Sequence, residues 1–250
     1  MLRSLKELVG YRVLAGDGRM GKVKDFYFSD EDWIVRYLVV HTGFWVFGRN
    51  VLISVHLLGQ PEWASQHFPV NLTQKQVQAS PDVDLAKPVS RVYEEKLLQY
   101  YRLPPYWGVS APLSGRPVYV PLQLTEGEHE AAGREWEQVH LRSAEEVFGY
   151  QVYGLDGEVG SALDFMVVDE NWQLRYLLVD ASSLEVDKRV LVALAWITKI
   201  DVAEKVVSID LTREAVRFSP TFDPALPVNR QDEEVLYDYY GRPKYWQGIE

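Results

Sequence analysis

The sequence predicts a mainly β protein built from two tandem small antiparallel β-barrels, each followed by short helices. Three observations support this prediction. The chain repeats itself, because Gly10-Tyr11 returns as Gly149-Tyr150, an offset of 149 − 10 = 139. Each copy contains about five or six short strand-like segments at hairpin spacing, which favours a small barrel. Each copy ends with helical segments and the motif Tyr-Tyr-x-x-Pro-x-Tyr-Trp, at residues 100–107 and 239–246.

The duplication runs without a gap from residues 2–107 to residues 141–246. The matched positions include Asp25 and Asp164, Arg36 and Arg175, Tyr106 and Tyr245, and Trp107 and Trp246. Fixed register over this length excludes chance and predicts a first unit at 1–107, a linker at 108–140 and a second unit at 141–250. Because duplicated units often resemble a homodimer, we expect approximate two-fold symmetry, with each unit closing its own hydrophobic interior.

The opening segment of each unit predicts a helical turn followed by a hairpin. Ser4 and Glu7 have the spacing of a capping box, and Ser143 and Glu146 repeat it. Tight turns are predicted at residues 17–18 and 156–157, both Asp-Gly, because Gly readily adopts positive φ. In the second hairpin strand the apolar residues change faces between Val23 and Phe26, which indicates a bulge near Asp25.

Two further strands follow in each unit, at residues 33–40 and 51–55 of the first copy. The second copy also predicts a hairpin around residues 203–204. Thr73 and Thr212 are typical N-caps of a short helix. A second helix is expected to begin near Ser90 or Asn229 and to end before the prolines at 104 and 243. In the linker, residues 118–124 alternate in polarity and are compatible with an edge strand.

These motifs resemble the PRC-barrel family. The shared pattern is G-x-x-V, then Asp, Trp and R-Y-L-V-V, then a loop and V-L-I-S, over residues 5–80 and 144–219. The family takes its name from the cytoplasmic domain of the photosynthetic reaction centre H subunit, and it includes a domain of a bacterial ribosome-maturation factor. The resemblance implies a barrel that serves as a docking or scaffolding module without catalytic residues. A role as an accessory to photosynthetic electron transfer follows from fold analogy alone.

Composition narrows the function classes. The net charge of −10 argues against general nucleic-acid binding. The absence of Cys excludes disulfides, thiolate catalysis and Cys-ligated metals, and it fits a reducing compartment. No signal peptide and no transmembrane run is visible. We therefore expect a cytoplasmic protein, without a cofactor.

The repeated Asp25–Arg36 and Asp164–Arg175 pairs have two interpretations. A carboxylate could be catalytic, but a cross-strand ion pair that fixes register is favoured. No nucleophile or His accompanies the pair in both copies, so the sequence predicts no catalytic residues and no enzyme. None of the five His residues recurs at the repeat offset; a metal site from His41 and His56 is the alternative, and no metal site is predicted.

The segment 43–48 presents Phe44, Trp45 and Phe47, whereas the aligned segment 182–187 is mixed and charged. Aromatic clusters often mark partner sites, so these three residues are the predicted anchors for a partner. Burial within this chain or in a homodimer is the alternative. For Tyr106-Trp107 and Tyr245-Trp246, the favoured role is structural, as a tether that folds the tail helix back onto its barrel.

Charge is distributed unequally between the units. Residues 1–107 carry 13 Lys/Arg against 11 Asp/Glu, net +2, whereas residues 141–250 carry 11 against 20, net −9. Separate faces that bind different partners would explain the unequal charge of the two units. A role of the acidic residues in keeping the protein soluble would also explain it. The leading hypothesis is a non-enzymatic interaction module for a protein that the sequence does not identify. The alternative is a small-molecule or metal sensor that uses the cleft between the barrels.

Overall fold

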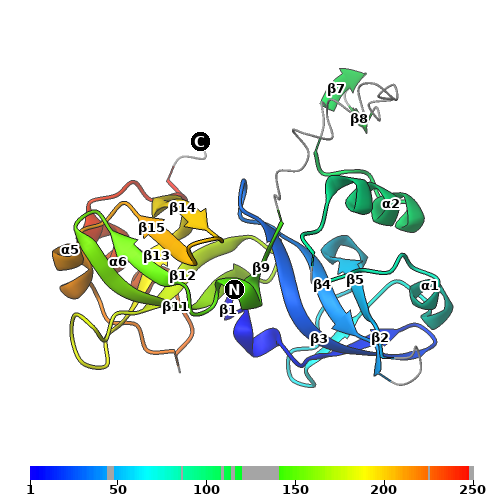
Figure 1. The fold of residues 1–250 in the computed structure, drawn as a ribbon, viewed down its shortest axis with the longest axis horizontal. Coiled ribbons are helices and arrows are strands. Elements are labelled where there is room, and N and C mark those ends of the chain that lie inside the picture. The colour runs from blue at the N-terminus through cyan, green and yellow to red at the C-terminus, as the bar shows by residue number, and fades with distance from the viewer. Residues whose placement is uncertain are drawn as a thin grey trace.

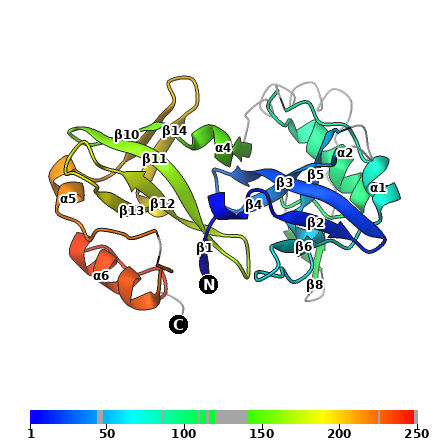
Figure 2. The ribbon, with the colours of Figure 1, turned by 90° about the horizontal axis from the view of Figure 1, so that it is seen from below.

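The computed structural model describes residues 1–43, 48–85, 87–107, 141–224 and 226–247, together with the backbone of 110–113 and 116–119. Two β-rich lobes lie side by side, and β1 (Leu2–Ser4) and β9 (Leu141–Ser143) lie between them (Figure 1). Seen from below, α1 (Gln74–Gln78) and α2 (Arg91–Tyr101) lie on the outer side of one lobe and α5 (Arg213–Arg217) and α6 (Arg230–Tyr240) on the outer side of the other, whereas α4 (Ala144–Val147) lies between the lobes (Figure 2). The predicted mainly β architecture with short helices is confirmed.

The strands and helices of the two units recur at the repeat offset, since β2 and β10 begin at residues 12 and 151, and 151 − 12 = 139. The first unit consists of β1 (Leu2–Ser4), η1 (Lys6–Leu8), β2 (Arg12–Ala15), β3 (Gly18–Ser29), β4 (Val35–His41), β5 (Asn50–Ser54), η3 (Val55–Leu57), β6 (His67–Pro69), α1 (Gln74–Gln78) and α2 (Arg91–Tyr101). The second consists of β9 (Leu141–Ser143), α4 (Ala144–Val147), β10 (Gln151–Gly154), β11 (Gly157–Val168), β12 (Leu174–Asp180), β13 (Arg189–Ala193), η4 (Leu194–Trp196), β14 (Ile197–Asp201), β15 (Val206–Ile209), α5 (Arg213–Arg217) and α6 (Arg230–Tyr240).

Each unit forms one curved sheet that does not close. The order is β5-β4-β3-β2-β6 in the first unit and β13-β12-β11-β10-β15-β14 in the second. The pairing is antiparallel except at β2–β6 and β10–β15, which are parallel, so a purely antiparallel closed barrel is not formed. The predicted bulge is confirmed, because the register shifts between Val23 and Asp25, and again between Ala162 and Asp164. Bulges bend a strand, which explains how such long strands curve the sheets.

The first strand of each unit belongs to the sheet of the other unit. β1 pairs with β11, with Leu2 opposite Val168, and β9 pairs with β3, with Leu141 opposite Ser29. The two exchanges are equivalent, because 141 − 2 = 139 and 168 − 29 = 139. The duplication is therefore organised as a reciprocal strand exchange.

An approximate two-fold axis passes between Ile34 and Gln173, which form an antiparallel bridge and are related by 173 − 34 = 139. A residue that pairs with its own copy must lie at the axis that relates the copies. Two reciprocal hydrogen bonds flank this bridge. The amide of Val35 donates to the carbonyl of Trp172 at 3.0 Å, and the amide of Leu174 donates to the carbonyl of Trp33 at 2.8 Å.

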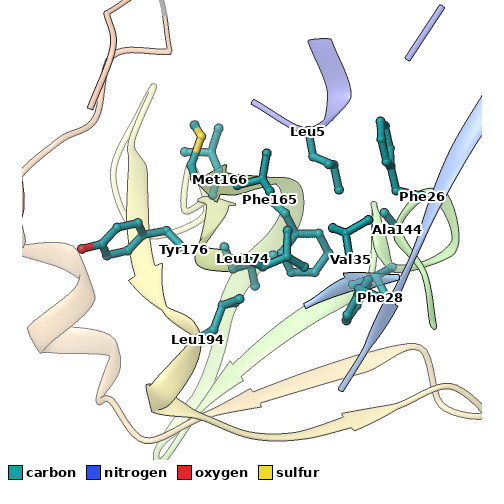
Figure 3. Packing of buried hydrophobic residues seen from close by; sticks show 14 of the residues in the cluster. Leu5, Phe26, Phe28, Val35, Ala144, Phe165, Met166, Leu174, Tyr176 and Leu194 are labelled. Carbon is teal, nitrogen blue, oxygen red and sulfur yellow. The ribbon is translucent and has the colours of Figure 1, made fainter. Parts of the chain in front are cut away.

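The hydrophobic core is continuous across the axis. Phe28 and Val35 of the first unit pack with Phe165 of the second (Figure 3), and the Phe28 and Phe165 ring centroids lie 5.0 Å apart. Trp172 lies 5.8 Å from Phe68 of the other unit, measured between ring centroids. The expectation that each unit closes its own interior is therefore wrong. An open sheet leaves apolar surface at its exchanged edge, and the other unit covers that surface.

Helix boundaries follow the predicted caps. The Thr73 side chain accepts from the amide of Gln76, and the Thr212 side chain accepts from the amide of Ala215. α2 and α6 begin after Ser90 and Asn229, and each ends in a left-handed residue, Arg102 or Gly241. These two are the longest helices in the described part of the chain, at 11 residues, which is too short to cross a bilayer.

The predicted hairpin around residues 203–204 is confirmed as β14–β15. In the first unit β6 corresponds to β15, but residues 58–62 pair with this region only through isolated bridges, between Leu58 and Val70 and between Glu62 and His67. Pro61 stands where the second unit has Ile200 and has no amide hydrogen to donate. In the linker, β7 (Ser110–Leu113) and β8 (Arg116–Tyr119) pair with each other, while residues 120–124 lie outside the described residues.

Candidate functional site

The repeated aspartates lie at the two exchange junctions. The Ser143 hydroxyl donates to Asp25 Oδ2 at 2.6 Å, and the Glu145 amide donates to Asp25 Oδ1 at 3.0 Å. Ser143 and Glu145 both come from the other unit. The copied junction is built alike, because the Ser4 hydroxyl and the Lys6 amide donate to Asp164, the latter at 2.9 Å. Each aspartate therefore holds the opening turn of the opposite unit.

Both junction carboxyls are buried, with Asp25 5% and Asp164 6% exposed. Burial raises the pKa of each carboxyl, and the serine hydroxyl and the backbone amides that donate to it oppose the rise. The carboxylates are fully engaged by donors, so they stabilise the junction and are poorly placed to accept a proton from a substrate.

The predicted ion pairs of Asp25 with Arg36 and of Asp164 with Arg175 are wrong. The bulges in β3 place Asp25 opposite Val39 and leave Arg36 out of the paired register. Arg36 instead forms an ion pair with Asp32 and lies over the Tyr106 ring, 3.9 Å from its centroid. Arg175 lies over the Tyr245 ring at 4.2 Å. The repeated arginines therefore contact the tail motif.

The tail motif of the first unit closes on a buried glutamate, Glu94, which is 1% exposed. The Tyr37 hydroxyl of β4 donates to Glu94 Oε1 at 3.0 Å, and the Tyr106 hydroxyl donates to the same oxygen at 2.7 Å. Arg91 Nη1 lies 3.3 Å from Glu94 Oε2. We call Arg36, Tyr37, Arg91, Glu94 and Tyr106 the tail clamp.

The second unit repeats the tail clamp. The hydroxyls of Tyr176 and Tyr245 donate to Glu233 Oε1 at 2.7 and 2.8 Å, and Arg230 Nη1 lies 2.9 Å from Glu233 Oε2. The guanidinium of Arg230 also lies 4.3 Å from the Trp246 ring centroid, as that of Arg91 does from Trp107. The repeated tyrosine–tryptophan pairs thus fix the tail against its own helix and sheet.

Sequence reasoning missed the two glutamates, although the repeat contained the signal. Glu94 and Glu233 are identical at the repeat offset, since 233 − 94 = 139, and so are Arg91 and Arg230, which pair with them. Burial raises the pKa of Glu94, against the lowering effect of its hydrogen bond from Tyr106 and of the Arg91 charge.

A cavity of about 690 Å³ lies at the junction of the first unit with β9. Its wall includes the Tyr27 side chain, whose pKa is raised to about 12, first by burial and then by the charges of Asp25, Glu146 and Glu145. Tyr27 therefore stays protonated and can donate a hydrogen bond. The described lining contains no His and comprises Lys24, Asp25, Tyr27, Leu85, Lys87, Pro88, Val89, Leu141, Arg142, Ser143, Glu145, Glu146, Val202 and Ala203.

The other exchange junction has a much smaller cavity of about 170 Å³. Met166 occupies the position of Tyr27 there, and Leu226 occupies that of Lys87. The strand exchange creates two equivalent junctions, and each has a cavity. The cavities differ in size because the side chains that line them differ between the copies.

The remaining predicted residues are placed as follows. Phe44, Trp45 and Phe47 lie outside the described residues. His41 Nδ1 lies 3.2 Å from the Asn50 side-chain oxygen. Across the part of the chain that the structure describes, no group of three or more His, Asp or Glu side chains is arranged to hold a metal ion.

These features define a class of protein: a tandem pair of open β-barrels that share one core through exchanged strands. The family model for the PRC-barrel domain matches residues 2–64, so the first unit contains a PRC-barrel domain, as its motifs predicted. The match does not extend to the second unit, whose relation to the first rests on the repeat and on its matching elements. No curated protein matches the chain.

Proposed function

We propose that this protein is a non-enzymatic interaction module that acts as a scaffold for another protein. The observation that carries the proposal is the use of the repeated polar residues. Asp25, Asp164, Glu94 and Glu233 are buried and engaged by donors from the fold itself. Groups that hold the fold in both copies are not available for chemistry on a substrate.

The differences in charge and composition between the copies support different contacts for each unit. The first unit carries a net charge of +2 and the second −9. The aromatic segment with Phe44, Trp45 and Phe47 is replaced by residues 182–187 in the second copy. Aromatic residues are enriched among interface hot spots, so these three remain our proposed anchors. We place the protein in the cytoplasm, in keeping with the absence of Cys.

Affinity capture tests this proposal. The immobilised full chain is incubated with an extract of its native host, and retained proteins are identified by mass spectrometry. We expect one or a few proteins to be retained, and to be lost when Trp45→Ala is used. Circular dichroism confirms that the variant is folded. Identical retention by both chains, or retention of no protein, contradicts the proposal.

The cavity beside Tyr27 supports a second candidate function, binding of a small molecule between the units. Its volume of about 690 Å³ lies within the range of ligand sites, and its lining mixes apolar walls with a protonated hydroxyl. A ligand that binds the native state raises the melting temperature by mass action. We expect Tyr27→Phe to reduce that rise without changing the fold. A screen of metabolite-sized compounds that leaves the melting temperature unchanged contradicts this candidate.

A further inference from the structure

A groove of about 210 Å³ runs beside α6 on the surface of the second unit. Its floor includes Leu191 of β13 and Leu236 of α6, both buried. Its lining comprises Leu191, Pro220, Thr221, Phe222, Asp223, Leu226, Pro227, Asp232, Val235 and Leu236. The groove shares Leu226 and Pro227 with the small cavity at the second exchange junction, and its other lining residues belong to neither an exchange junction nor a tail clamp.

In the first unit, a tyrosine occupies the equivalent space. Tyr93 stands at the position of Asp232, since 232 − 139 = 93. Its ring packs against the cluster that contains Leu52 and Leu97, the counterparts of Leu191 and Leu236. Its hydroxyl donates to the Pro81 carbonyl at 3.1 Å. In the second unit the short side chain of Asp232, whose carboxylate accepts from the Asn229 amide at 3.0 Å, replaces this ring beside the groove, and Phe222 replaces Val83.

The edge of the groove has also changed from charged to apolar. Leu226 is 62% exposed and Val235 is 51% exposed, and their counterparts in the first unit are Lys87 and Lys96. The same fold thus accepts lysine at both positions. Exposed aliphatic side chains beside an open groove suit an apolar ligand surface.

Carboxylates surround these apolar residues. Asp223 and Asp232 line the groove, Glu234 is exposed on α6, and the second unit carries a net charge of −9. Asp238, also exposed on α6, is paired with Lys244 at 2.8 Å. Negative surroundings favour a partner with positive charge.

We infer that the α6 groove docks a short segment of a partner protein in which apolar side chains are flanked by lysine or arginine. This inference rests on the proposed interaction function and names the chemistry of the partner. Apolar side chains enter over Leu191 and Leu236, and the flanking cations face the carboxylates of α6. An amphipathic helix or an extended peptide of this composition presents both features.

Fluorescence anisotropy with the full chain tests the inference. The probe is a fluorescein-labelled amphipathic peptide of leucine and lysine, and the comparison peptide replaces each lysine with glutamate. We expect the leucine–lysine peptide to bind at least tenfold more tightly, with weaker binding at higher salt. Equal affinity for both peptides overturns the inference.

Three variants locate the binding site. Leu226→Gln with Val235→Gln removes apolar surface without changing charge, and Asp232→Tyr fills the groove as Tyr93 does in the first unit. Asp232→Asn is the matched control, because it removes the same charge and leaves the groove open. We expect the first two to weaken binding at least tenfold and the control to weaken it only a fewfold. Circular dichroism confirms the folding of each chain.

The outcomes separate this inference from the proposed function. If the full chain captures a protein from its host and the groove variants capture it equally well, the groove inference is overturned and the interaction function stands. If the chain self-associates in sedimentation experiments and Leu226→Gln with Val235→Gln abolishes the association, a second copy is the occupant and the inference is overturned. Loss of peptide binding in the groove-filled chain supports the inference.

Discussion

The two units share their interior and differ on their surface. Asp25 and Asp164 make the same junction, and Glu94 and Glu233 close the same tail clamp. At the surface, Lys87 and Lys96 become Leu226 and Val235, and Tyr93 becomes Asp232. A duplicated unit keeps the residues that hold it to its copy, while positions facing solvent are free to change. We therefore look for contacts outside the chain among the exposed positions at which the units differ.

Truncation of a large side chain buried between the units should give the largest loss of stability. Trp172 is 8% exposed and packs on Phe26 and Phe68 of the first unit, whereas its copy Trp33 is only half-buried. Trp172→Ala should lower the free energy of unfolding by about 3–5 kcal/mol, from lost burial and the resulting cavity. Trp33→Ala is the matched control and should cost less. Urea denaturation measures both, and equal losses would contradict the difference in burial.

The junction aspartates come next. Asp25→Ala or Asp164→Ala leaves a serine hydroxyl and two backbone amides without their acceptor. We expect each to lower the free energy of unfolding by about 2–3 kcal/mol, the cost of leaving buried donors unpaired. Because the junctions are equivalent, the two losses should agree within about 1 kcal/mol. A large loss at one junction and none at the other, in urea denaturation, would disprove their equivalence.

The tail clamp should show a dependence on pH. Burial raises the pKa of Glu94 from its ordinary value of 4.5. The folded state then holds this proton more tightly than the unfolded state. Its contribution to stability is therefore fully present below about pH 4.5 and is lost as pH rises through the folded pKa. Glu94→Gln cannot titrate, so its unfolding free energy should change less over this window than that of the unmodified chain. Parallel pH profiles would refute this assignment.

Surface exchanges should have the smallest effect on stability. Leu226→Lys with Val235→Lys gives the second unit the residues of the first, and Lys87→Leu with Lys96→Val does the reverse. We expect each pair to change the free energy of unfolding by less than about 0.5 kcal/mol per substitution. Thermal melting monitored by circular dichroism measures the change. A loss of several kcal/mol would show that these positions support the fold.

Local patterns predicted much of each unit. The bulge beside Asp25 and the helix caps at Thr73 and Asn229 follow from neighbouring residues. The two hairpins were also predicted, but their turns lie at residues 16–17 and 155–156, one position before the expected Asp-Gly pairs, because Gly18 and Gly157 are already paired with Ala15 and Gly154. Strand exchange was not predicted, because β1 has three residues and pairs with a strand more than 160 positions away. Either unit offers β1 the same local pattern. Which sheet β1 joins depends on how the two complete sheets are arranged in space, and a short stretch of sequence does not carry that information.

The misassigned Asp25–Arg36 pair has the same origin. Opposite charges on neighbouring strands favour pairing, but the bulges of β3 change which residues face each other. The bulge was visible in the sequence, whereas its effect on the register of Arg36 was not. Glu94 was missed because glutamate on a short helix is ordinarily exposed, and its burial here depends on Tyr37 and Tyr106, which lie outside the helix.

Disulfide trapping tests the strand exchange most directly, because the chain contains no Cys of its own. Leu2 pairs with Val168, whereas a unit that kept its own first strand would place Leu2 opposite Ser29, since 168 − 139 = 29. Directly opposed residues in antiparallel strands lie within disulfide distance. Under mild oxidation, Leu2→Cys with Val168→Cys should form an intramolecular disulfide detectable by peptide mass spectrometry, and Leu2→Cys with Ser29→Cys should not. The opposite result would contradict the shared core.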